Sequence, residues 1–162
     1  AFPSFGSERT GAPVVSYCRM DDQEIRSREP ILDPDAILIQ DASLLHQVDL
    51  FAGLKESSYV LINTSQTLEQ LGLKDLLNKI NPRHILMVPA TELALKYIGR
   101  PLPNAVLLGG FSALSGQISL ESVKKAISEK FPLKISEANQ KAAEAAYQIV
   151  LKEHQEEGSL HA

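Results

Sequence analysis

The sequence predicts an α/β domain in which a mostly parallel β-sheet is flanked by helices. Three short runs rich in Ile, Leu and Val recur at similar spacing, at residues 36–40, 59–63 and 84–88. Each run is almost continuously apolar, as is typical of strands that are buried on both faces of a parallel sheet. Helical patterns lie between and after these runs, and such alternation favours a layered α/β domain. A fourth strand-like run, at residues 14–19, comes earlier in the chain.

Two helical patterns follow the second and the third of the main runs. Apolar residues at 68, 71, 73, 76, 77 and 80 form a nearly helical stripe, so we expect a helix over residues 68–80. Residues 91–98 have the composition of a short helix. Gly99 is suited to ending that helix, because glycine readily adopts the left-handed conformation that often follows a helix.

Two more helices are predicted towards the end of the chain. Ser119 is placed to cap a helix over residues 120–131. The last helix is expected from about 137 to about 156, with Gly158 as its stop and residues 158–162 as a loose tail. Its inward face is mostly alanine, at positions 138, 142, 145 and 146, which allows close packing against a neighbouring element.

Composition and charge narrow the functional classes. The chain has 162 residues, enough for one domain with a substantial core, and its formal net charge of −4 comes without the basic face that nucleic-acid binding requires. Its one cysteine, Cys18, cannot form an internal disulfide and cannot by itself hold zinc or an iron–sulfur cluster. The longest apolar run, residues 105–114, is too short to span a bilayer, and the N-terminus lacks the pattern of a signal peptide. We therefore expect a soluble, cytoplasmic protein.

Polar residues follow the predicted strands at the edge where ligands bind in parallel α/β sheets. Asp41, Asn63, Thr64 and Thr91 lie at the carboxyl ends of the strands or just beyond them. They are candidates for ligand binding. The alternative is that they cap helices and shape turns, and the sequence favours this for any one of them, because Asp, Asn and Thr are common in such turns.

A glycine-bracketed charged loop near the start of the chain is the strongest local signal. It comprises Gly6, Ser7, Glu8, Arg9, Thr10 and Gly11. The glycines allow a tight turn and close approach to a ligand, and the Arg9 guanidinium suits a phosphate or a carboxylate. A surface turn with a local ion pair explains the same residues equally well.

The sequence offers no complete catalytic set. Residues 109–116 nearly match the G-x-S-x-G pattern around Ser112, but Leu114 replaces the second glycine, so a closely packed helix is the favoured interpretation. Cys18 lies in a strand-like run and is expected to be a buried, inert thiol. None of the four scattered histidines, at positions 46, 84, 154 and 161, is expected to be catalytic.

Four longer stretches stand out together and in order: AFPSFGSERTGAPVVSYCRM, IRSREPILDPDAILIQDASLL, GRPLPNAVLLGGFSALSGQISLESVKKAI and NQKAAEAAY. FGSERTGAPV and PNAVLLGG are their most specific parts. In this combination, which extends from Ala1 to about Tyr147, the chain resembles the gamma subunit of the 2-oxoacid:ferredoxin oxidoreductases, and most closely the pyruvate type.

The resemblance implies a Rossmann-like gamma domain over residues 1–157 and a place in a large cytoplasmic complex. Such a complex decarboxylates a 2-oxoacid on thiamine diphosphate, passes electrons through 4Fe–4S clusters to ferredoxin, and makes an acyl-coenzyme A. The gamma subunit is implied to hold neither the thiamine nor the clusters. It packs against alpha, beta and delta-type subunits and is associated with the coenzyme A side of the active site.

Two site assignments follow from the resemblance. The loop Gly6, Ser7, Glu8, Arg9, Thr10 and Gly11 would face the neighbouring subunits and the path of coenzyme A. Asn104, in the turn before the glycine-rich helix, would fix that turn.

Family members begin with a strand, a G-R-G-G-Q-G turn and a helix ahead of the segment that matches Ala1. We expect this chain to lack that unit, so that sheet edges are left unpaired and the chain is poorly stable alone or tightly bound to a partner. From the residues alone, the alternative function is a free-standing α/β domain that binds a nucleotide or coenzyme A without catalysis.

Overall fold

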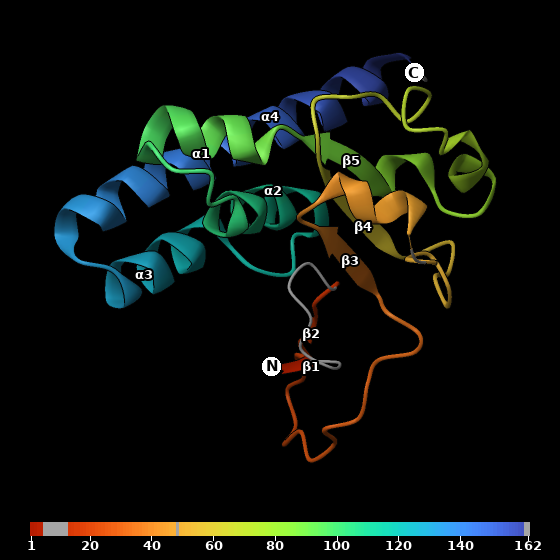
Figure 1. Cartoon of the computed structure of the whole chain (residues 1–162), viewed down its shortest axis with the longest axis horizontal. Coiled ribbons are helices and arrows are strands. Elements are labelled where there is room, and N and C mark those ends of the chain that lie inside the picture. Colours follow the sequence, from red (N-terminus) through yellow and green to blue (C-terminus); the bar gives the residue numbers. More distant parts are fainter. Residues whose placement is uncertain (5–12, 48, 161–162) are drawn as a thin grey trace.

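The computed structural model describes residues 1–4, 13–47 and 49–160. All five strands precede the four α-helices along the described part of the chain (Figure 1). The elements are β1 (Phe2–Ser4), β2 (Val15–Tyr17), β3 (Ala36–Ile39), the 3₁₀ helix η1 (Ala42–His46), β4 (Tyr59–Asn63), the 3₁₀ helices η2 (Lys74–Asn78) and η3 (Pro82–His84), β5 (Ile85–Val88), α1 (Ala90–Ile98), α2 (Asn104–Ser115), α3 (Leu120–Lys130) and α4 (Leu133–Leu160). Over the described ranges, no helix is both long and apolar enough to cross a membrane.

The three main apolar runs form a parallel sheet in the order β3-β4-β5. Ile37 pairs with Val60 across the first strand pair, and Val60 with Ile85 across the second. The central strand β4 is the most deeply buried, since Val60, Leu61 and Ile62 have no exposed surface. The predicted α/β class with a parallel sheet and flanking helices is therefore confirmed.

Helices cover one face of this sheet. Leu61, Leu86 and Val88 point from the strands into a core that is completed by apolar residues of α1, α2 and α4. Glycine brings α2 and α4 close together: a Cβ atom at Gly109 would overlap the backbone carbonyl of Ala143. The glycine-rich segment thus forms a closely packed helix, as the sequence predicted.

Connecting segments cover the opposite face. Ile39, Val60, Ile62 and Ile85 of the strands pack there against apolar residues of the β3–β4 and β4–β5 connections, including Leu54, Leu71, Leu76 and Ile80. The predicted helix over residues 68–80 was wrong, because the segment forms turns followed by the short η2. Gly72 adopts φ +71°, a left-handed conformation that interrupts a right-handed helix. Leu71, Leu76 and Ile80 of the apolar stripe are nevertheless buried, whereas Leu77 is exposed.

The strand-like run at residues 14–19 lies outside the parallel sheet. Its central part is β2, which pairs antiparallel with β1 in a separate two-stranded sheet. Cys18 follows β2 and is exposed, so the expectation of a buried thiol was wrong. Within the described part of the chain, β2 is itself largely at the surface, with Val15 and Ser16 exposed and Tyr17 half-buried, and Cys18 follows it there.

The predicted helices at residues 91–98 and 120–131 are confirmed as α1 and α3. Gly99 follows α1 with φ +76°. The Ser119 hydroxyl oxygen accepts a hydrogen bond from the Ser122 N–H at 3.1 Å and caps α3, which ends one residue short of Phe131.

The last helix, α4, is longer than predicted. It begins at Leu133 and continues through Gly158, where the sequence predicted a stop, to Leu160. Its fully buried alanines are Ala142, Ala143 and Ala146, whereas Ala138 and Ala145 are half-buried. The inward face therefore includes Ala143, which was not predicted, and Ala138 and Ala145 are less buried than expected.

Candidate functional site

The carboxyl edge of the sheet is held together by the side chain of Asn63. Its amide nitrogen donates hydrogen bonds to the Gln40 carbonyl and to the Thr91 hydroxyl, both at 2.8 Å. Its amide oxygen accepts a hydrogen bond from the Thr91 N–H at 3.0 Å. Asn63 therefore joins the end of β3 to the first turn of α1 and has no amide hydrogen left for a ligand.

Asp41 and Thr64 also make local hydrogen bonds. An Asp41 carboxylate oxygen accepts from the Ser43 N–H at 2.9 Å and caps η1. Hydrogen bonds from the Ser43 side chain and backbone lower the pKa of Asp41, and slight burial opposes them. The Thr64 N–H donates to the Val88 carbonyl at 3.0 Å, and its hydroxyl accepts from the Gln66 N–H at 3.1 Å. These contacts support the alternative that the edge residues cap helices and shape turns.

Ser112 is buried within α2, and its hydroxyl donates to the Ile118 carbonyl at 2.7 Å. This bond ties α2 to the segment that leads into α3. A nucleophilic serine needs an accessible hydroxyl next to a general base, and here the hydroxyl proton is directed to a backbone carbonyl. Ser112 is therefore a structural residue.

The residues carried over from the family resemblance can be placed only in part. Asn104 is the first residue of α2 and is exposed, and its side-chain oxygen accepts from the Ala105 N–H at 3.0 Å. The loop of Gly6, Ser7, Glu8, Arg9, Thr10 and Gly11 lies outside the described residues. The functional roles assigned to both remain predictions.

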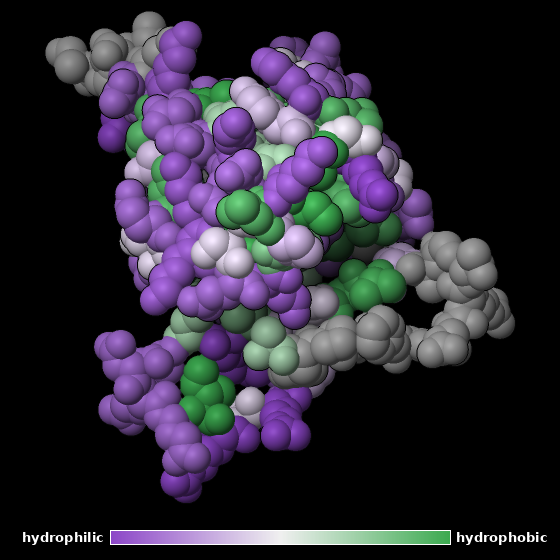
Figure 2. All heavy atoms as spheres, turned by 90° about the vertical axis from the view of Figure 1, so that its left-hand side faces the viewer, coloured by the Kyte–Doolittle hydropathy of each residue, from purple (hydrophilic) through white to green (hydrophobic). Residues whose placement is uncertain are grey.

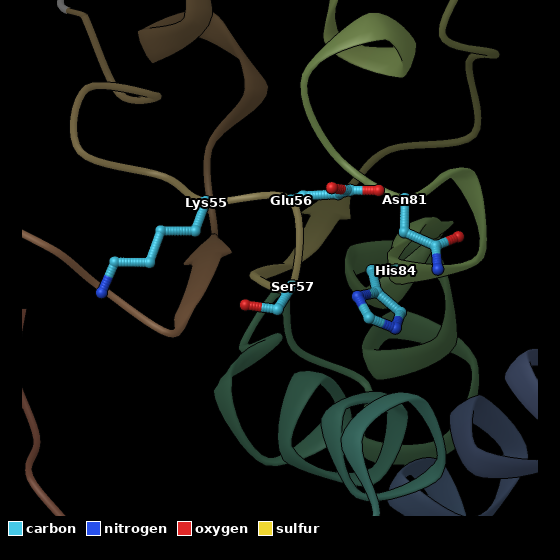
Figure 3. A pocket seen from close by; sticks show the side chains of 5 residues that line it. All are labelled: Lys55, Glu56, Ser57, Asn81 and His84. Atoms are coloured by element: carbon cyan, nitrogen blue, oxygen red, sulfur yellow. The ribbon is translucent and has the colours of Figure 1, made fainter.

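A shallow pocket lies at the opposite, amino edge of the sheet (Figure 3). It measures about 420 Å³ and is lined by Lys55, Glu56, Ser57, Asn81 and His84. The His84 ring lies 4.3 Å from the Tyr59 ring, centroid to centroid, and its Nδ1 is buried without a hydrogen-bond partner. The sequence predicts no catalytic role for His84, and only the fold shows that the residue before β5 lies beside the residues before β4.

The donor chemistry of the chain does not fit an iron–sulfur cluster. A 4Fe–4S cluster is held by four cysteine thiolates, and the sequence contains only Cys18. Within the described part of the chain, no three His, Cys, Asp or Glu side chains are grouped closely enough to hold a metal ion. The thiolates of this chain alone therefore cannot hold such a cluster.

Comparison with known proteins identifies the family. Residues 1–149 match the family described as pyruvate ferredoxin/flavodoxin oxidoreductase. The chain is 42% identical to the pyruvate synthase subunit PorC of Methanocaldococcus jannaschii, over 95% of this chain and 81% of that protein. It is 43% identical to the common gamma subunit of the pyruvate/ketoisovalerate oxidoreductases of Thermococcus kodakarensis, over 91% of this chain and 78% of that protein.

A solved structure gives the same result. The crystal structure of the pyruvate oxidoreductase subunit PORC from Thermotoga maritima is similar, with a TM-score of 0.60 and 30% sequence identity. The match covers 73% of this chain and 64% of the crystallised chain, which is less than two thirds of its length. The resemblance inferred from the sequence motifs is thus confirmed, and the chain belongs to the pyruvate ferredoxin/flavodoxin oxidoreductase family.

Proposed function

We propose that this chain is the gamma subunit of a cytoplasmic pyruvate:ferredoxin oxidoreductase. The observation that carries the proposal is that relatives named PorC or gamma subunit match more than nine tenths of the chain at about 40% identity. The complex would decarboxylate pyruvate oxidatively, form acetyl-coenzyme A and CO₂, and transfer the electrons to ferredoxin. Thiamine diphosphate and 4Fe–4S clusters supply the decarboxylation and electron-transfer chemistry, and alpha, beta and delta-type subunits hold them.

The chain itself would serve as a rigid structural part of the active-site surroundings. Hydrogen bonds of Asn63 and Thr91 close the carboxyl edge of the sheet, and the hydroxyl of Ser112 is bound within the fold. These groups are committed to the fold, which supports a non-catalytic, positioning role. A cytoplasmic location fits a chain whose single thiol, Cys18, stands exposed, because exposed free thiols persist in reducing compartments.

The proposal is tested by affinity purification of the tagged chain from its native cell. We expect co-purification of the other oxidoreductase subunits, together with iron and thiamine diphosphate measured in the eluate. Recovery of the chain alone, without iron or thiamine, would contradict the proposal. An independent ligand-binding domain would then be the better explanation, and calorimetric titration with coenzyme A would be its test.

The coenzyme A side of the proposal concerns Arg9. If the Arg9 guanidinium contacts a phosphate of coenzyme A, the Arg9→Ala complex should show an increase in KM for coenzyme A of roughly tenfold or more. This corresponds to the loss of a charge-assisted hydrogen bond worth about 1.5–3 kcal/mol. Arg9→Lys, which keeps the charge, should recover part of the affinity, and the KM for pyruvate should stay unchanged. An unchanged KM for coenzyme A with weaker assembly would assign Arg9 to the subunit interface instead.

A further inference from the structure

The segment that leads into the first strand of the parallel sheet extends away from the folded body. We define residues 13–35, which contain β2 and lead into β3, as the arm. All ten residues from 21 to 30 are exposed. Figure 1 shows the arm as the orange segment below the sheet, and Figure 2 shows it as a lobe below the body that is hydrophilic with hydrophobic atoms among the polar ones. Most of the arm therefore contributes little to the core of the domain.

The arm nevertheless has a defined shape. The Arg19 guanidinium donates to the Glu29 carbonyl at 2.7 Å and to the Pro30 carbonyl at 3.4 Å, which closes the arm into a loop. Arg26 forms an ion pair with Glu24 at 2.9 Å. A loop that is preorganised in this way loses less conformational entropy when it binds a partner than an unstructured loop does.

The base of the arm is fixed to the β3–β4 connection and to β4. The Ser58 hydroxyl donates to the Pro34 carbonyl at 2.9 Å, and the Tyr59 N–H donates to the Asp35 carbonyl at 2.9 Å. Gly53 lies against the arm so closely that a Cβ atom there would overlap the Leu32 carbonyl. The body therefore holds the arm in one direction.

Exposed apolar side chains are concentrated on the arm. Among the residues that the structure describes, eleven large hydrophobic side chains are exposed, and five of them belong to the arm: Val14, Val15, Met20, Ile25 and Leu32. Leu32 is 80% exposed and Met20 is 61% exposed. Scattered apolar residues on a surface need no explanation, but several on one short protruding segment are typical of a surface that a partner covers.

The charge of the arm indicates the kind of partner. The arm contains six carboxylates and only three guanidinium groups and is therefore acidic; the carboxylates are those of Asp21, Asp22, Glu24, Glu29, Asp33 and Asp35, and the guanidinium groups those of Arg19, Arg26 and Arg28. The chain as a whole carries a net charge of −4, so a second copy would meet the arm with like charge. Complementary charge is what steers and selects protein partners.

We propose that the arm is a docking surface for a different polypeptide of the oxidoreductase, one that presents an apolar groove bordered by Lys and Arg side chains. Met20 and Ile25 enter the groove, and the carboxylates of the arm meet its basic border. This inference rests on the proposed function as a subunit, but it goes further because it assigns the contact to one segment and states the chemistry of the partner surface.

The test compares two substitutions of exposed apolar residues in the tagged full-length chain, expressed in its native cell. Met20→Glu places a charge on the arm, and Leu95→Glu places the same charge on α1, where the side chain is 50% exposed. We expect Met20→Glu to reduce the recovered oxidoreductase subunits about tenfold or more, as for a residue at the centre of an interface. Leu95→Glu should leave recovery at the wild-type level, and both variants should keep the wild-type circular dichroism spectrum.

A second variant tests the charge of the partner. Asp21→Lys combined with Asp22→Lys should reduce recovery at low salt and weaken its dependence on salt concentration, because opposite-charge attraction is screened by ions. Equal recovery with the arm variants and the wild type would overturn the inference and leave the subunit function intact. If the wild-type chain recovers no oxidoreductase subunits, the proposed function fails and the inference with it. Arm-dependent self-association in sedimentation experiments would also overturn the inference, in favour of a second copy.

Discussion

The two faces of the parallel sheet are covered in different ways. On one face, α2 and α4 lie so close together that Gly109 contacts the backbone of α4. On the other face, the cover consists of turns and the short helices η1 and η2. Leu76 of η2 packs against the strands, together with Leu71 and Ile80 from the flanking turns. Both faces exclude water from the strands. We call these the helical face and the connection face. The packing of the helical face depends on the close approach of two helix backbones, whereas the packing of the connection face depends on a few apolar side chains.

The largest effect is expected from Gly109→Ala on the helical face. The added Cβ would overlap the Ala143 carbonyl, which belongs to backbone and cannot turn aside, so α2 and α4 must separate. We expect a loss of about 3 kcal/mol or more in the free energy of unfolding, at the upper end of overpacking effects. Urea denaturation followed by circular dichroism measures this loss.

Gly110→Ala is the matched control for this prediction. Its Cβ would lie 3.3 Å from the Leu61 Cδ2, the end of a side chain that can adjust, and alanine favours a helix over glycine by about 1 kcal/mol. The stability of this variant should stay within about 1 kcal/mol of the wild type. Similar losses for the two variants would show that the close approach of α2 and α4 does not limit stability.

A pair of leucine truncations sharpens the comparison between the faces. Leu107 of α2 is 1% exposed and Leu76 of η2 is 6% exposed. Leucine-to-alanine changes in cores cost about 2–5 kcal/mol, and the cost is larger where the surroundings cannot collapse into the cavity. We expect Leu107→Ala to cost up to about 3 kcal/mol and Leu76→Ala about 2 kcal/mol, the lower end of that range, measured by the same denaturation. The reverse order would mean that the connection face is the more rigid one.

The smallest effect concerns the cap of η1 on the connection face. Asp41→Ala removes the acceptor of the Ser43 N–H, and we expect a loss of about 0.5 kcal/mol at neutral pH, at the low end for helix caps. Since hydrogen bonds from Ser43 lower the pKa of Asp41, the folded state favours the carboxylate. Its stabilisation is therefore present above the ordinary aspartate pKa of about 3.9 and is lost as pH falls through the lower folded value.

The pH dependence of this cap can be measured from thermal unfolding midpoints. The difference between the wild type and Asp41→Ala should shrink below about pH 4. Asp41→Asn keeps an oxygen acceptor without a titrating group, so it should remain close to the wild type at neutral pH and lack the acid-dependent change. A wild-type midpoint that responds to acid no more than that of Asp41→Asn would count against the carboxylate as the source.

Much of the fold could be predicted from the sequence, because the information is local. Continuous apolar runs indicated β3, β4 and β5, and Ser119 and Gly99 marked the start of α3 and the end of α1. The helix over residues 68–80 was predicted wrongly because a periodic apolar stripe reports burial and does not report backbone conformation. Here the left-handed conformation of Gly72 interrupts any helix, although apolar residues on both sides of it are buried.

The candidate site was less predictable, because its geometry depends on contacts between distant residues. Their positions at or after the ends of predicted strands placed Asn63 and Thr91 at one edge of the sheet. Only the fold shows that they hydrogen-bond to each other and that Asn63 also donates to the Gln40 carbonyl. The contact between the His84 and Tyr59 rings likewise joins residues that are distant in sequence, beside a buried His84 Nδ1 that has no hydrogen-bond partner. The exposure of Cys18 was not predicted, because a strand-like pattern does not show whether other elements cover the strand.

Gly53, in the β3–β4 connection, affects the direction of the arm. Its φ of +76° and its lack of a side chain let the backbone of Leu32 lie against it. A Cβ atom there would overlap the Leu32 carbonyl, so any other residue requires the arm or the β3–β4 connection to shift. We therefore expect a substitution at Gly53 to weaken the proposed docking of the arm even though every apolar residue of the arm is kept. For a protein engineer, the same position offers a way to change which chains assemble together.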